Sequence, residues 1–205
     1  NCVSSTDPIF LALKDVVSKY EVPREYMDDL ISGMEDDLYT NRYQTFEELY
    51  SYCYRVASTV GLVCIGIYGL ECTAAEREFA EAWGIAMQLT NISRDVIEDK
   101  MSNRLYIKSS FSDLKNTIDI ADKFYDNAFF SIRAIPLRMR FAIVVARRVY
   151  RRIGYKVLRC GDFETYEKSG RIYVRNFEKI FETILSLFDL FKLYLAKRSA
   201  NTTTK

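Results

Sequence analysis

The 205-residue sequence contains no histidine, which excludes a Ser-His-Asp triad, a Cys-His pair and any histidine-ligated zinc within this chain. Only three prolines and eight glycines interrupt it, and this scarcity of turn-forming residues favours long helices over short strands. An excess of one charge is missing too, since 29 basic and 28 acidic residues give a net charge of +1. The composition therefore predicts a helical protein with no nucleic-acid partner.

Long hydrophobic runs are also absent. The longest apolar run, Val56 to Leu70, contains Ser58 and Thr59 and is shorter than the roughly 20 residues that a membrane span needs, so we expect a core helix there. Hydrophobic residues make up 49% of the chain, which is ample for one buried core. We expect one domain over residues 1–200 and a polar tail over 201–205.

The five cysteines show no C-x-x-C spacing, and three of them lie in apolar helical contexts. Buried, unpaired cysteines of this kind are typical of a reducing compartment. We therefore expect an intracellular protein.

Capping and breaking residues predict where the helices begin and end. Asp7-Pro8 starts a first helix, Pro23 a second, and two capping-box patterns, Thr45 to Glu48 and Thr73 to Glu76, start two more. A fifth helix ends at Pro136, a sixth at Gly161, and a last one covers about 176–197. The expected apolar face of the second helix consists of Met27, Leu30, Ile31, Met34 and Leu38.

The segment from Gln88 to Asp99 contains the strongest functional signal. Four polar residues recur at spacings of three and four: Gln88, Asn91, Asp95 and Asp99. At 100° per residue they fall within roughly 80° of one another, on one stripe of a largely apolar helix. Two carboxylates and two amides on a buried stripe suit Mg²⁺, which prefers hard oxygen ligands. The alternative is a solvated face whose carboxylates cap the helix or form salt bridges.

Longer motifs resemble a known family. QLTNISRDVIED (88–99), followed by NRLYI, is similar to the second aspartate-rich motif of the squalene/phytoene synthase family of head-to-head prenyl transferases. NRYQTFEELYSYCYRVASTVGLV (41–63) resembles the other helix signature of the family, closest to its phytoene synthase branch. ARRVYRRIGYKV (146–157) and RIYVRNFEKI (171–180) resemble the last helices. The resemblance implies an all-α, isoprenoid-synthase-type bundle around a central cavity, of which this chain would form the C-terminal two thirds.

The resemblance also implies an activity. Family members join two prenyl diphosphates through a cyclopropyl intermediate, and the phytoene synthase branch condenses two geranylgeranyl diphosphates to phytoene with Mg²⁺ or Mn²⁺ and without nicotinamide. The alternatives are squalene-type synthesis from farnesyl diphosphate, which uses NADPH, and a non-catalytic family member that acts as a binding or assembly factor.

Particular residues receive roles from this resemblance. Asp95 and Asp99 would be metal ligands and catalytic groups, with Gln88 and Asn91 on the same stripe toward the substrate. Arg94 and Arg104 would contact phosphate, or alternatively form salt bridges. Substrate-facing and catalytic positions would further include Tyr52, which stabilises a cation or handles a proton unless it is a plain core tyrosine, and the cavity-lining Val56, Val60 and Tyr150.

Two departures shape what we expect of this chain. Ser58 and Asn103 stand where glycine is usual in the family. The first aspartate-rich motif of the family would lie upstream of this sequence, and Asp36 and Asp37 stand in the wrong context to supply it. We therefore expect residues 1–205 alone to bind Mg²⁺-diphosphate weakly and to turn over no substrate.

One basic cluster has two interpretations. Arg147, Arg148, Arg151 and Arg152 recur on one helix, where they would form a solvated face or favour peripheral association with an anionic membrane surface, near which a hydrophobic substrate resides.

Overall fold

A computed structural model describes residues 6–20, 22–39 and 42–202. The α-helices are α1 (Pro8–Lys19), α2 (Arg24–Tyr39), α3 (Phe46–Cys53), α4 (Thr59–Ile67), α5 (Ala74–Arg94), α6 (Val96–Met101), α7 (Phe111–Ser131), α8 (Leu137–Leu158), α9 (Phe163–Lys168) and α10 (Asn176–Thr202). A π-helical turn, η2 (Tyr54–Ser58), joins α3 to α4, and a 3-10 turn, η3 (Ile132–Ala134), follows α7. In the described ranges the only β feature is an isolated bridge between Arg42 and Leu105, so the all-α prediction is confirmed.

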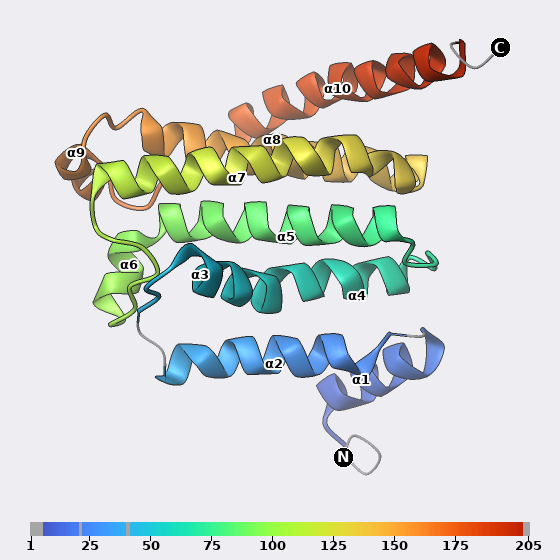
Figure 1. Cartoon of the computed structure of the whole chain (residues 1–205), viewed down its shortest axis with the longest axis horizontal. Coiled ribbons are helices and arrows are strands. Elements are labelled where there is room, and N and C mark those ends of the chain that lie inside the picture. Colours follow the sequence, from blue (N-terminus) through green and yellow to red (C-terminus); the bar gives the residue numbers. More distant parts are fainter. Residues whose placement is uncertain (1–5, 21, 40–41, 203–205) are drawn as a thin grey trace.

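The long helices form successive layers. Figure 1 shows α2 at the bottom, then α3 with α4, then α5, then α7 with α8, and α10 at the top. Helix α5 lies at the centre, because it packs against α7, α8, α4 and η2. The helix that contains the polar stripe is therefore the core helix of the bundle.

Most local signals act as predicted. The Asp7 side chain accepts a hydrogen bond from the Ile9 amide, and Thr73 with Glu76 forms a complete capping box. At the start of α3 the Thr45 hydroxyl caps the Glu48 amide, but the Glu48 carboxylate accepts from the Gln44 amide instead of completing the predicted box. Helix α10 continues to Thr202, two residues into the expected tail.

The prediction for the apolar face of α2 is wrong for three of its five residues, since Met27 and Leu30 are half-buried. Ile31, Met34 and Leu38 are exposed, whereas Tyr26 and Gly33 are buried. Gly33 explains the rotation, since a Cβ atom there would lie 2.8 Å from Val56 and from the side chain of Arg55. This close approach turns the acidic end of α2 toward the bundle, and Asp36 pairs with Arg55 at 2.5 Å.

A second close contact joins α5 to the π-helical turn. A Cβ atom at Gly84 would lie 2.5 Å from the backbone nitrogen and Cα of Ser58. The hydroxyl of Ser58 is fully buried and donates to the Glu81 carbonyl at 2.9 Å. Ser58 is thus accommodated where the family usually has glycine, because its polar atom has a partner on α5.

Cys53, Cys64, Cys72 and Cys160 are free thiols, and Cys2 lies outside the described residues. No helix within the described ranges combines the length and the apolar character that a membrane crossing requires.

Helix α10 packs on the bundle with its polar side. Arg148 of α8 pairs with Glu182 at 2.8 Å and with Asp189 at 2.7 Å. The other arginines of the basic cluster are paired as well, Arg147 with Asp126, Arg151 with Asp122 and Asp126, and Arg152 with Glu178. The solvated-face interpretation is therefore wrong, since acids of α7 and α10 neutralise all four guanidinium groups. These same ion pairs leave the cluster little free charge to offer to a membrane.

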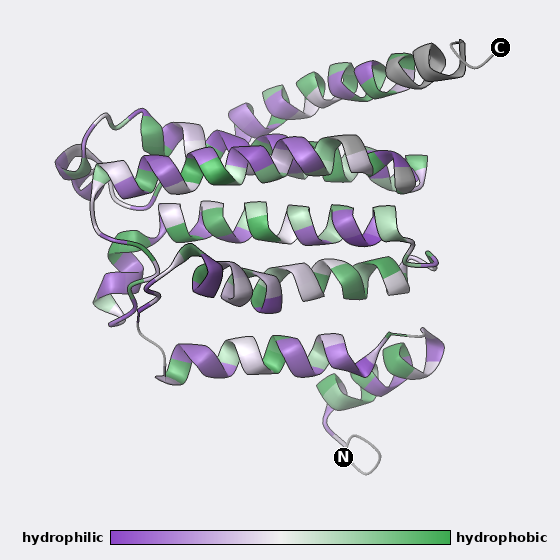
Figure 2. Ribbon diagram, in the orientation of Figure 1, coloured by the Kyte–Doolittle hydropathy of each residue, from purple (hydrophilic) through white to green (hydrophobic). Residues whose placement is uncertain are grey.

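The outer side of α10 is apolar and exposed, and hydrophobic residues recur along it in Figure 2. The exposed side chains are spaced as three successive heptads and comprise Phe177, Ile180, Phe181, Ile184, Leu187, Phe188, Phe191, Tyr194 and Leu195. A stripe of this size exceeds the scattered apolar residues that are normal on a monomer surface.

We expect residues 1–205 to self-associate through this stripe. Replacing Phe181 and Phe188 together by Gln should shift the chain toward monomer, because it removes two exposed rings from the middle of the stripe without touching the polar face of α10. Sedimentation velocity over a concentration series measures the shift. Ile9→Gln, at an exposed apolar residue of α1, is the control, and a wild-type chain that is monomeric throughout would contradict the expectation.

Candidate functional site

The candidate residues gather at one end of the bundle and along α5. The C-terminal end of α2, the start of α3, the C-terminal end of α5 and the short helix α6 meet at the left of Figure 1. Residues widely separated in sequence therefore surround the carboxylates of the polar stripe.

An apolar cleft runs along α5. Its volume is about 360 Å³, within the range usual for small-molecule sites. Val56 and Val60 line it from one side, as predicted, and Gln88 and Asn91 form its polar end. The remaining wall is mostly apolar and includes Ala57, Ile65, Phe79, Trp83, Met87 and Ile143.

The polar stripe continues past the end of α5. Asp95 has φ −105° and ψ 15°, which ends α5 and begins α6. The helical hydrogen bonds nevertheless persist from the Asp95 amide to Asn91 (2.9 Å) and from the Asp99 amide to Asp95 (2.8 Å). The predicted single helix is therefore two, and the four polar residues follow one another across the kink.

The predicted ligands suit a divalent cation. Asn91 Oδ1 is buried without a hydrogen-bond partner in the described chain. Burial, and next the charge of Asp95, raises the pKa of Asp99 to about 6, while Arg104 opposes the shift. A bound cation would give Asn91 Oδ1 a partner and would favour the ionised form of Asp99. No group of three or more Cys, Asp or Glu residues with metal-site geometry occurs among the described residues, but Mg²⁺ commonly uses only one or two carboxylates and completes its shell with water and phosphate.

A basic pocket opens beside Asp95. Arg94 forms a bidentate ion pair with Asp95 (2.7 and 2.5 Å), and Arg171 approaches the same carboxylate at 3.5 Å. The pocket has a volume of about 410 Å³, and its charged lining consists of Arg94, Arg171, Arg175 and Lys179. Tyr150 lines this pocket and not the apolar cleft, which corrects its predicted place.

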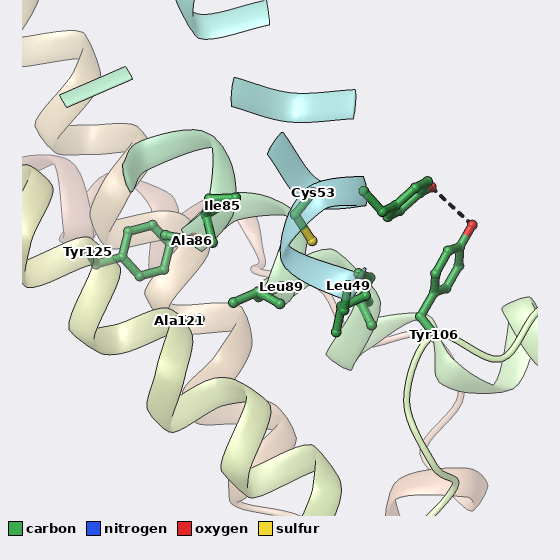
Figure 3. Packing of buried hydrophobic residues seen from close by; sticks show 10 residues of the cluster. Leu49, Cys53, Ile85, Ala86, Leu89, Tyr106, Ala121 and Tyr125 are labelled. Atoms are coloured by element: carbon green, nitrogen blue, oxygen red, sulfur yellow. Dashed lines mark hydrogen bonds between the residues drawn. The ribbon is translucent and has the colours of Figure 1, made fainter. Parts of the chain in front are cut away.

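Tyr52 lies in a buried polar cluster away from the cleft wall. Its hydroxyl donates to Tyr106 at 3.1 Å and faces Asp37 Oδ2 at 3.2 Å. Figure 3 shows the ring of Tyr106, with a dashed line joining its hydroxyl to the second tyrosine hydroxyl of the cluster. Arg104 lies 3.7 Å from Asp37. It therefore forms a salt bridge, which was the alternative to a phosphate contact.

The turn after α6 brings Arg104 and Tyr106 to this cluster. Asn103 has φ +58°, and the Asn103 and Arg104 amides bond to the carbonyls of Lys100 and Asp99, which is the Schellman pattern that ends a helix. Asparagine tolerates the left-handed region better than most residues. Asn103 can therefore hold the left-handed conformation that this turn requires.

Sequence reasoning missed several of these groups. Asp37 does not belong to an aspartate-rich motif, and no pattern in the sequence distinguishes Tyr106. Arg171 and Lys179 lie in the segment 171–180 that resembles the family. No local spacing connects that segment to α5, which lies 77 or more residues earlier.

The sequence is similar to known proteins of one family. Residues 2–110 match the family model described as squalene/phytoene synthase. The 15-cis-phytoene synthase of Enterobacter agglomerans is 31% identical over 76% of this chain and 59% of its own length. The chloroplastic phytoene synthase of Daucus carota is 34% identical over 82% of this chain and 48% of its own length. The chain thus spans about half to two thirds of such relatives.

Solved structures share the fold. A dehydrosqualene synthase in complex with ligand superposes with a TM-score of 0.74 over 92% of this chain and 72% of its own, at 21% identity. A squalene synthase from Alicyclobacillus acidocaldarius has a TM-score of 0.68 over 77% of this chain and 67% of its own, at 24% identity. The bundle is therefore the all-α fold of these synthases.

Proposed function

Because the chain belongs to the squalene/phytoene synthase family, we propose that it forms the diphosphate-ionising part of a head-to-head prenyl transferase. The proposed reaction is the condensation of two geranylgeranyl diphosphates to phytoene through a cyclopropyl diphosphate. The relatives suggest the substrate class, and the geometry of this chain suggests the role of each residue.

One juxtaposition supports the proposal above all others. The apolar cleft ends at Gln88 and Asn91, and the carboxylates Asp95 and Asp99 follow one and two turns later, next to the basic pocket. A prenyl diphosphate has the same order of parts, a long apolar chain followed by a highly charged head. The cleft suits the chain, and the adjoining basic pocket suits the head.

The residues around the head group would share its charge. Asp95, Asp99 and the unpartnered Asn91 Oδ1 would hold Mg²⁺ or Mn²⁺. The ion would supply Lewis-acid stabilisation of the leaving diphosphate. Arg171 and Lys179 would contact phosphate oxygens, as planar and point-charge donors respectively. Arg94 already neutralises Asp95 and would be shared between that carboxylate and phosphate.

The cleft would protect the cation that forms when diphosphate leaves. Its lining is apolar around Val56, Val60 and Trp83, and a prenyl chain that fills it would displace water and strengthen electrostatic contacts. An aromatic ring facing a desolvated cation contributes on the order of 2 kcal/mol. Trp83 lines the cleft itself, whereas Tyr52 would act from the neighbouring polar cluster.

Product analysis tests the proposal. A protein that contains this chain and spans the complete family domain is incubated with Mg²⁺ and either geranylgeranyl or farnesyl diphosphate, with and without NADPH. Phytoene from the C20 substrate, independent of NADPH, is the expected product. Squalene as the sole product would establish the squalene-type alternative. No product from either substrate, with an intact fold, would favour the non-catalytic binding or assembly factor.

A further inference from the structure

The hydroxyl of Tyr52 is held by two residues from distant parts of the chain. Asp37 comes from the C-terminal end of α2, and Tyr106 from the loop after α6. The Tyr52 hydroxyl lies 3.2 Å from Asp37 Oδ2 and 3.1 Å from the Tyr106 hydroxyl, and Tyr106 donates to Asp37 Oδ1 at 2.6 Å. One carboxylate therefore faces two tyrosine hydroxyls, one on each oxygen.

Stacked rings fix this cluster in place. The ring centroids of Tyr52 and Tyr106 are 5.1 Å apart, and Tyr43 lies 5.2 Å from Tyr52 and 5.9 Å from Tyr106. Tyr52 is 3% exposed and Tyr106 is 8% exposed. The ring contacts hold Tyr52 and Tyr106 in place, so their hydroxyl oxygens have little freedom to move. The hydrogen bonds then decide in which direction each hydroxyl proton points.

The hydrogen bonds also determine where the protons point. Burial, and next the hydrogen bond with Tyr106, raises the pKa of Tyr52, so this hydroxyl keeps its proton. Tyr106 gives its only proton to Asp37, and Tyr52 then donates to the Tyr106 oxygen or to Asp37. A hydroxyl whose proton is directed at a carboxylate turns its lone pairs to the opposite side, and the bond polarises its oxygen.

We propose that Asp37 is a positioning residue for the proposed condensation: with Tyr106, it orients the hydroxyl of Tyr52 and makes its oxygen electron-rich. This inference rests on the proposed function, in which Tyr52 stabilises a cation or handles a proton. Among the described residues, Asp37 forms its hydrogen bonds and ion pair with Tyr52, Tyr106 and Arg104 and not with Asp95 or Asp99, although its charge contributes to the raised pKa of Asp99. Arg104, 3.7 Å from Asp37, balances its charge.

The kinetic test uses the protein that spans the complete domain. Asp37→Asn keeps the shape of the side chain and removes its charge. We expect it to lower kcat by roughly 10- to 100-fold, as a misplaced catalytic group does. KM should stay within about threefold, because Asp37 lines neither the apolar cleft nor the basic pocket. Tyr106→Phe should lower kcat less, because Tyr52 can still donate to Asp37. Asp36→Asn is the matched control: its residue is adjacent, pairs with Arg55, and should leave kcat unchanged.

A second measurement is independent of turnover. In the 205-residue chain labelled with ¹³Cζ-tyrosine, the Tyr52 resonance should shift in Asp37→Asn and stay in place in Asp36→Asn. A Tyr52 resonance insensitive to Asp37, or an unchanged kcat in Asp37→Asn, overturns the inference while the proposed function stands. An Asp37-dependent resonance in a wild type without turnover overturns the proposed function and retains the positioning of Tyr52. A loss of kcat that merely follows a loss of folded protein in thermal unfolding also overturns the inference.

Discussion

Asp99→Asn is expected to abolish most prenyl condensation and to leave the fold at least as stable as the wild type. The carboxylate lies half-buried near Asp95, and both burial and that neighbouring charge raise its pKa to about 6. At neutral pH the folded chain therefore holds an unfavourable charge, which the asparagine removes. The same substitution deletes one of two proposed carboxylate ligands, and a loss of roughly 10²- to 10³-fold in kcat is typical when one electrostatic stabiliser of a leaving group is removed.

The measurement combines activity with stability. Initial rates with prenyl diphosphate and Mg²⁺ are compared with thermal unfolding of the same variant in the complete domain. Glu98→Gln is the matched control, since Glu98 precedes Asp99 in the first turn of α6 and is not assigned to the metal. A variant with full activity would show that Asp99 is not a ligand. Gain of stability with loss of activity is characteristic of a functional site that strains the fold.

Arg148→Met is expected to destabilise the fold by about 3–5 kcal/mol, because it leaves two buried carboxylates without a partner. Arg148 donates to Glu182 and Asp189 at 2.8 and 2.7 Å, and the side chains of these acids are 8% and 11% exposed. Without the guanidinium, the polar face of α10 carries uncompensated charge into its contact with α8. Helix α10 should then leave the bundle, and the basic pocket that includes Lys179 should be lost with it.

Urea unfolding measures the change in the free energy of unfolding, and limited proteolysis reports whether α10 is released first. Arg24→Met is the control. Arg24 pairs with Asp28 on the surface, with side chains 88% and 59% exposed, so its loss should cost at most about 1 kcal/mol. The combined variant Arg148→Met, Glu182→Leu, Asp189→Leu should recover stability, since an apolar contact can replace a buried ion pair. A loss below about 1 kcal/mol for Arg148→Met alone would contradict the expectation.

The sequence by itself determined the polar stripe and the ends of most long helices. Capping at Asp7 and Thr73, the break at Pro136 and the stop at Gly161 act over a few residues, and short-range signals of this kind are legible in a sequence. The stripe from Gln88 to Asp99 is legible for the same reason. The longer motifs around it indicated the family. Val56 and Val60, predicted to line a cavity, do line the apolar cleft.

Only the tertiary structure decided which residues surround that stripe. Tyr52 meets Asp37, which lies 15 residues before it, and Tyr106, which lies 54 residues after it. Arg171 approaches Asp95 from the segment that precedes α10. The face that α2 buries also follows from a contact, that of Gly33 with Arg55 and Val56. Periodicity reports only neighbours three and four positions apart on one helix, whereas these pairings depend on how loops and close helix contacts place one helix against another.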